Sequence, residues 1–152
     1  MSISIQLLEE ELKSALKARE ETKAGTLRML LSALRSAEKD KKYRTQEDFT
    51  PEDIVGIVSS EAKKRREAIE AFGKAGRQEL AAKEKEELDI LLPFLPEQLS
   101  EEEVEKLVKE AIASTGATTQ KDLGKVMGAL APKVKGRADG SLVSGKVREL
   151  LG

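Results

Sequence analysis

Apolar residues recur every three to four positions along nearly the whole chain, and no segment alternates apolar and polar residues for long enough to form a strand. This spacing places apolar side chains on one face of a helix, whereas a half-buried strand needs a period of two. The pattern therefore predicts an all-α fold. We expect a first helix over about residues 3–19, a second after Gly25 that ends in the charged run 39–44, a third from Pro51 over some twenty residues, and a fourth over 78–92.

The clearest helix starts carry capping residues. Thr50 can accept a hydrogen bond from a free amide, and Pro51 follows it at the first helical position, where its missing amide costs nothing. Ser100 and Glu103 have the spacing of a capping box, which starts a fifth helix that ends before Gly116. Similar capping residues at Thr119–Asp122 and at Asp139 predict a sixth and a seventh helix.

Prolines mark two boundaries. Pro93 and Pro96 lack amide donors and bias the residues before them away from helical backbone, so the helical pattern must break there. We therefore predict a helical N-terminal domain over residues 1–92 and a small three-helix domain over 97–152. Pro132 is expected to end the sixth helix.

Composition excludes most routes to catalysis. The 152 residues include no Cys, His or Trp, which excludes thiol nucleophiles, histidine bases and the usual zinc sites. The segment 71–76 lacks the spacing of a phosphate-binding loop. We expect no catalytic residue, no metal and no cofactor, although a serine–lysine pair stays open as a catalytic arrangement.

Acidic residues are abundant, and paired carboxylates can act as acid and base or hold Mg²⁺. The acids of segment 79–89 alternate with lysines on a helix whose polar face should be solvated. Those of segment 101–105 occupy a helix start, where negative charge favours the helix dipole. We interpret both groups as solvated surface.

Local charge is more informative than the net charge of −1. Residues 97–118 carry two bases and six acids, whereas residues 119–152 carry seven bases and three acids. The excess of four cations in the last segment predicts either a surface for phosphate oxygens or simple solubilisation of small helices. A second basic run, Lys63–Arg66, points in several directions around a helix, which favours a solvated face.

Only four aromatic residues are present, so an exposed platform that stacks nucleotide bases is not expected. Any RNA would have to be recognised through its backbone and shape. This favours a folded RNA such as tRNA over a single-stranded sequence.

Two segments resemble the bacterial YqeY family: Leu92-Pro93-Phe94-Leu95-Pro96-Glu97-Gln98-Leu99-Ser100 and the run at 63–69. The resemblance covers essentially the whole chain. The ending, Met127-Gly128 followed by Lys135-Gly136-Arg137-Ala138-Asp139 and Leu142-Val143, is similar to the tail domain of the B subunit of the tRNA-dependent amidotransferase (GatB). The resemblance implies a GatB-tail-like C-terminal domain and a role near tRNA. In that larger enzyme the tail contacts tRNA while catalysis resides elsewhere.

From the residues and the resemblance together we predict an accessory protein without catalysis of its own that binds tRNA or a tRNA-handling enzyme. Two alternatives stay open: a subunit-like contributor to carbon–nitrogen ligation with glutamine as amido donor, and a helical protein-interaction module. Gly136 is expected to allow a positive φ, and Lys135 and Arg137 to be free for a phosphate. The predicted nucleic-acid-binding residues are Lys133, Lys135, Gly136, Arg137, Lys146 and Arg148.

The sequence also bears on location. No stretch has the roughly 18 apolar residues of a membrane span, and residues 1–6 lack the features of a signal peptide. We expect a cytoplasmic protein without a membrane partner, and leave its oligomeric state open. The absence of Asn and Cys alongside abundant Lys and Glu suggests a source that grows at high temperature.

Overall fold

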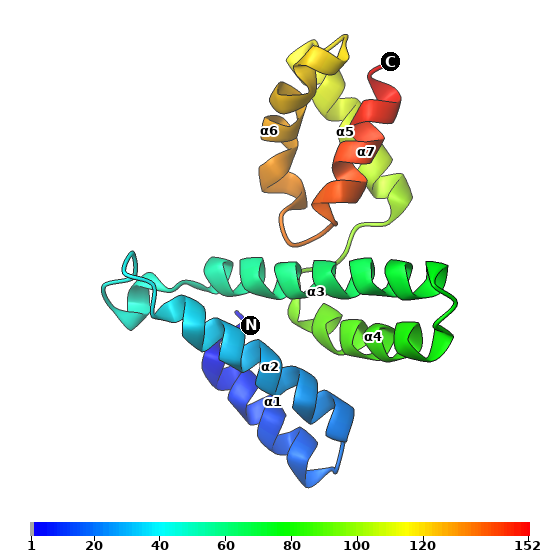
Figure 1. Cartoon of the computed structure of the whole chain (residues 1–152). Helices are drawn as coiled ribbons and strands as arrows, with labels where there is room; N and C mark the ends of the chain where they lie inside the picture. Colours follow the sequence, from blue (N-terminus) through cyan, green and yellow to red (C-terminus); the bar gives the residue numbers. More distant parts are fainter. Residues whose placement is uncertain (1) are drawn as a thin grey trace. The chain divides into compact units, whose positions relative to one another are not determined.

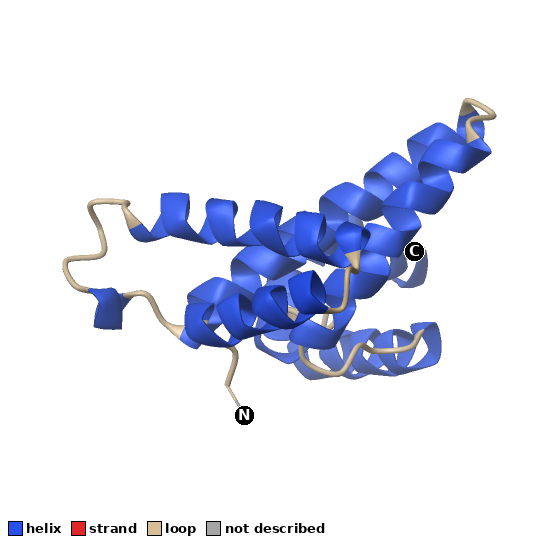
Figure 2. Ribbon diagram, turned by 90° about the horizontal axis from the view of Figure 1, so that it is seen from below, coloured by secondary structure: helices blue, strands red, loops and turns tan. Residues whose placement is uncertain are grey.

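The computed structural model describes residues 2–152, and within this range the chain consists of helices and their connections without a strand (Figures 1 and 2). This confirms the predicted all-α class. Within residues 2–152, every helix is too short or too polar for a membrane span. The chain divides into two compact units, residues 1–95 (unit 1) and residues 96–152 (unit 2).

Unit 1 is built from two helical hairpins. Helix α1 packs against α2, α3 packs against α4, and α2 also contacts both α3 and α4 (Figure 1). The four helices are α1 (Ile5–Lys17), α2 (Glu21–Glu38), α3 (Pro51–Lys74) and α4 (Gln78–Leu91), with 3-10 turns η1 (Gln46–Asp48) and η2 (Leu92–Phe94).

Side-chain caps set the helix starts of unit 1. Ser4 accepts a hydrogen bond from the Leu7 amide at 3.1 Å, so α1 begins at Ile5 rather than near residue 3. Thr50 and Asp53 form a reciprocal capping box, in which the Thr50 amide donates to Asp53 at 2.8 Å. The predicted start of α3 is therefore confirmed.

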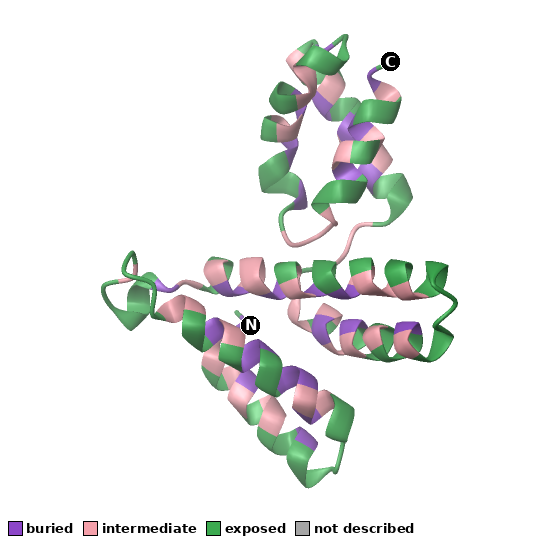
Figure 3. Ribbon diagram, viewed as in Figure 1, coloured by how far each residue is buried: buried purple, intermediate pink, exposed green. Residues whose placement is uncertain are grey.

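The core of unit 1 is made largely of long aliphatic side chains, and it follows the inner faces of the helices (Figure 3). Phe94 and Leu95, from the proline-containing segment after α4, pack against its edge. Its buried members are Ile3, Leu8, Leu27, Leu30, Leu31, Leu34, Phe49, Ile54, Val58 and Leu91.

Unit 2 contains α5 (Glu101–Thr115), the 3-10 turn η3 (Gln120–Asp122), α6 (Leu123–Val134) and α7 (Gly140–Leu150). Ser100 and Glu103 form the predicted capping box, and Gly116 ends α5 with a φ of 70°. Thr119 and Asp122 also form a capping box, but it closes η3, so α6 begins only at Leu123.

The prediction that Pro132 ends the sixth helix is wrong, because α6 continues through Pro132 to Val134. The proline removes one amide donor from the last turn. The turn still closes, since the Lys135 amide donates to the Ala131 carbonyl at 3.1 Å, and Val134 is buried in the core. Apolar burial at Val134 outweighs the lost hydrogen bond.

The core of unit 2 is built from small side chains. Six of its ten buried members are valines, contributed by all three helices. The full set is Val104, Val108, Ala111, Ala117, Val126, Leu130, Val134, Val143, Val147 and Leu151.

Candidate nucleic-acid interface

The six predicted site residues lie at two places in unit 2. Helices α6 and α7 are antiparallel neighbours, joined by a turn at one end of the pair (Figure 1). Lys133, Lys135, Gly136 and Arg137 lie at this turn, whereas Lys146 and Arg148 lie in the second half of α7. The side-chain amide of Gln120, just before α6, donates to the Arg148 carbonyl at 2.8 Å, which places Arg148 at the end opposite the turn.

The turn has the backbone that the sequence predicts. Gly136 has a φ of 74°, a backbone conformation that residues with a Cβ rarely adopt. Asp139 caps α7 by accepting a hydrogen bond from the Ser141 amide at 3.0 Å. Because this carboxylate already occupies the start of α7, the helix dipole is partly satisfied, and the lysines beside the turn remain the groups that can meet an anion.

Arg137 is engaged with the protein itself. Its guanidinium donates to the Glu97 carbonyl at 3.2 Å and to the Lys133 carbonyl at 3.4 Å. The segment before α5 is held at the turn by two further contacts: the Leu99 amide donates to the Arg137 carbonyl, and the Gln98 side chain donates to the Gly136 carbonyl, both at 2.8 Å. Arg137 is thus a positioning residue for this segment.

Lys133 and Lys135 have exposed side chains on either side of Val134, which points into the core. Within residues 2–152, neither lysine forms an ion pair. Lys146 differs, because it pairs with Glu149 at 3.4 Å and its side chain is 24% exposed. The turn therefore presents two free cations, which we call the turn lysines. Helix α7 presents Lys146, which is partly neutralised, and Arg148, which is exposed and forms no ion pair within residues 2–152.

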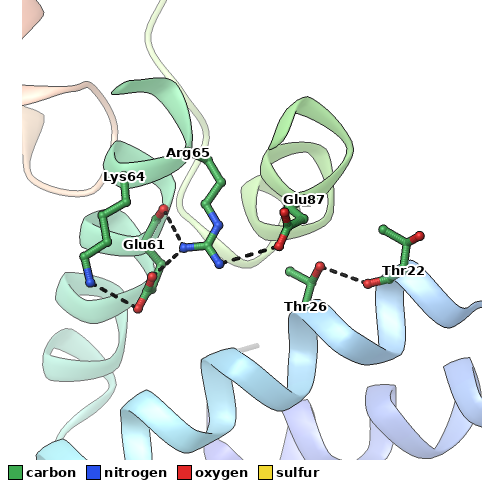
Figure 4. A network of polar contacts seen from close by, with 6 residues as sticks. All are labelled: Thr22, Thr26, Glu61, Lys64, Arg65 and Glu87. Carbon is green, nitrogen blue, oxygen red and sulfur yellow. Dashed lines mark hydrogen bonds and ion pairs between the residues drawn. The ribbon is translucent and has the colours of Figure 1, made fainter. Parts of the chain in front are cut away.

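The basic run Lys63–Arg66 contains a feature that the sequence did not reveal. Arg65 is 6% exposed, and its guanidinium lies within 2.5 Å of Glu61 on α3 and 3.7 Å of Glu87 on α4 (Figure 4). The side chains of Glu61 and Glu87 are only 16% and 12% exposed. The interpretation of this run and of the α4 acids as solvated surface is therefore wrong for Arg65 and Glu87.

The charges of this network balance. Lys64 adds a second cation at 3.5 Å from Glu61, so two cations face two carboxylates (Figure 4). Thr26 lies nearby on α2, but its hydroxyl donates to the Thr22 carbonyl of its own helix. No charge is left over to hold a ligand, and the network joins α3 to α4. Within the described range no group of three or more acids is placed to hold a metal ion.

Comparison with known proteins gives consistent matches. A family model described as "Yqey-like protein" matches residues 5–151. "Altered inheritance of mitochondria protein 41, mitochondrial" of Pyrenophora tritici-repentis is 29% identical over 154 residues, covering 99% of this chain and 82% of its own. The protein of the same name in Saccharomyces cerevisiae is 28% identical, covering 82% of this chain and 69% of its own. An uncharacterized protein of Schizosaccharomyces pombe is 36% identical over 94 residues, covering 62% of this chain and 73% of its own.

Proposed function

The chain belongs to the Yqey-like protein family, and from this premise and its charge distribution we propose that it is a non-catalytic accessory protein that binds tRNA or an enzyme that handles tRNA. The observation that carries the proposal is the pair of turn lysines, Lys133 and Lys135, which are exposed and unpaired within residues 2–152 in the segment with an excess of four cations. Phosphate oxygens are the ligands that such cations favour.

The geometry supports contact with a nucleic-acid backbone rather than with bases. Unit 2 contains no aromatic residue, so it offers no ring on which a base could stack. Gly136 allows the positive φ of the turn, and the Arg137 guanidinium hydrogen-bonds to the Glu97 and Lys133 carbonyls beside the two lysines. Two neighbouring cations at one turn suit a folded RNA, whose phosphates have fixed positions.

A salt titration of tRNA binding tests the proposal. Filter binding of bulk tRNA to the full chain should weaken steeply as salt rises. Replacing Lys133 and Lys135 with Ala should weaken binding and lower the slope of log affinity against log salt by roughly one to two, because each lost phosphate contact removes about 0.7 to 0.9. The variant K63A/K83A is the matched control, since it removes two exposed lysines from unit 1.

The outcomes separate the candidate functions. Equal affinity and equal slope for K133A/K135A and the parent, with both folded, would show that the turn lysines only solubilise unit 2. Loss of binding in K63A/K83A alone would place the RNA on unit 1. Either result would overturn the proposal for this site.

Under this proposal the chain catalyses no reaction by itself. Purified protein should neither hydrolyse glutamine nor turn over ATP, because the sequence offers no His, Cys or phosphate-binding loop. Glutaminase or ATPase activity that a single Glu or Ser substitution abolishes would favour the alternative of a contributor to carbon–nitrogen ligation.

The proposal keeps the cytoplasmic location predicted from the sequence, because tRNA and the enzymes that charge it are found there. Mitochondria also contain tRNA, so the mitochondrial names of the fungal relatives are compatible with the same role. Cell fractionation of the source organism tests the location.

A further inference from the structure

A groove of about 600 Å³ runs along the α1–α2 hairpin of unit 1. It involves neither the turn lysines nor the buried network of Arg65. Three leucines form its apolar lining: Leu31 is buried, Leu12 is half-buried and Leu16 is 46% exposed. Over residues 2–152 three large apolar side chains are exposed, at 44–55%, and Leu16 is the one that lines this groove. The apolar lining of this groove is one that a partner's apolar side chain could cover, with Leu16 as its exposed contact.

Cations line the same groove. Lys13 comes from α1, and Arg28, Arg35 and Lys39 come from α2 and its C-terminal cap. The groove holds one carboxylate, Glu9, which pairs with Arg35. Within the described range no acid forms an ion pair with Lys13, Arg28 or Lys39. The groove thus combines an apolar strip with three uncompensated positive charges.

These dimensions and charges define the occupant. The α2 part of the groove extends from residue 28 to residue 39, which is about 16 Å at 1.5 Å per residue, or three helical turns. A helix that lays apolar residues at i, i+3/i+4 and i+7 into such a groove would bury Leu16, while acidic residues beside the stripe would face the cations. An RNA backbone would satisfy the cations but would leave the leucines exposed.

We propose that the α1–α2 groove binds an acidic amphipathic helix of a partner protein. This site shares no residue with the tRNA site proposed on unit 2, since all of its residues lie in unit 1. It gives the protein two separate surfaces, one for a phosphate backbone and one for a helix.

NMR titration of the full ¹⁵N-labelled chain tests the proposal. The probe is a synthetic amphipathic peptide of about four helical turns, with leucines in an i, i+3/i+4, i+7 stripe flanked by glutamates. We expect saturable shifts confined to amides of residues 9–39. A second peptide with lysine in place of every glutamate should bind about tenfold more weakly or worse, because it meets like charges.

Two variants remove the groove's features separately. K13E/R28E reverses two exposed cations, and Leu16→Asp removes the exposed apolar contact; each should weaken peptide binding by about tenfold or more. The matched control K63E/K83E makes the same charge change on exposed positions of α3 and α4 and should bind like the parent. Circular dichroism checks that every variant is folded.

Three results would overturn the proposal. The first is the absence of shifts at residues 9–39 up to roughly 1 mM peptide. A second is equal binding of the acidic and basic peptides, which would indicate unspecific apolar adhesion. The last is a different occupant, shown either by tRNA shifting the same amides or by a dimer in sedimentation velocity that Leu16→Asp abolishes.

Discussion

The two units of this chain use the same helix-capping chemistry but place their charges differently. Unit 1 surrounds a core of leucine and isoleucine and buries one guanidinium, that of Arg65, against two carboxylates. Unit 2 has a core made mainly of valine, with two leucines and two alanines, and none of its charged side chains is buried. A basic residue in such a run can therefore be buried in an ion pair between helices or exposed to solvent. The outcome depends on whether the fold brings carboxylates from another helix next to it.

The largest expected effect comes from removing Arg65 from its buried network with Glu61 and Glu87. Replacing Arg65 with Met leaves Glu61 and Glu87 nearly buried without their shared cation, and should cost about 3–5 kcal/mol of unfolding free energy. Tyr43, the only tyrosine, reports on unit 1 by fluorescence during urea unfolding. The triple variant R65M/E61Q/E87Q also removes both carboxylate charges and should recover part of the loss. An unchanged urea midpoint for Arg65→Met would contradict the structural role of the network.

Truncating the core of unit 2 gives the next largest effect. Leu130 is fully buried, so Leu130→Ala should cost about 2–5 kcal/mol. A 57-residue unit with a core of small side chains has little stability in reserve. We therefore expect amide signals of residues 96–152 to lose dispersion in this variant while those of unit 1 persist. Cooperative loss of both units at one denaturant concentration would show that they do not unfold separately.

Contacts between residues close in the sequence could be predicted from it, whereas contacts between separate helices could not. The capping boxes at Thr50 and Ser100 involve residues three apart, so their pattern is local and could be recognised directly. The burial of Arg65 depends on Glu87, 22 positions away on another helix, and no local pattern announces that contact. A signal that could have suggested it is the apolar stripe of α3, which runs through Ala62 beside the basic run.

The candidate site divides in the same way. The positive φ of Gly136 and the cap by Asp139 follow from neighbouring residues and are confirmed. The engagement of Arg137 with the Glu97 carbonyl, 40 positions earlier, needed the fold. Continuation of α6 past Pro132 was also missed, because burial of Val134 is a tertiary effect.

A smaller effect is expected at Arg137. Arg137→Ala removes two hydrogen bonds to carbonyl groups at a half-exposed position, so it should cost about 1 kcal/mol or less. It should increase hydrogen exchange at the Leu99 amide, which bonds to the same turn, while leaving the salt slope of tRNA binding nearly unchanged. A loss of slope as large as that of K133A/K135A would show that Arg137 contacts phosphate directly.

The smallest expected effect is a pH dependence that both units share. The Thr50 amide and hydroxyl hold the pKa of Asp53 below its usual range, and the Thr118 and Thr119 amides do the same for Asp122. Because the folded-state pKa is lowered, this stabilisation is complete above about pH 4 and is lost as the pH falls further, through the lowered folded-state value. Urea midpoints measured at about pH 5 and pH 3 should therefore differ less in D53N/D122N than in the parent. An equal difference in both proteins would contradict the assignment.

We propose that the turn lysines of unit 2, and not the cations of unit 1, contact the phosphates of tRNA. Chemical-shift mapping of the full ¹⁵N-labelled chain with unlabelled bulk tRNA tests it most directly, because both units are observed in one sample. We predict that tRNA shifts or broadens the amides of residues 131–137 and that added salt reverses the change, with residues 9–39 and the α3–α4 hairpin unaffected. Perturbation confined to unit 1, or none in either unit at low salt, would contradict the claim.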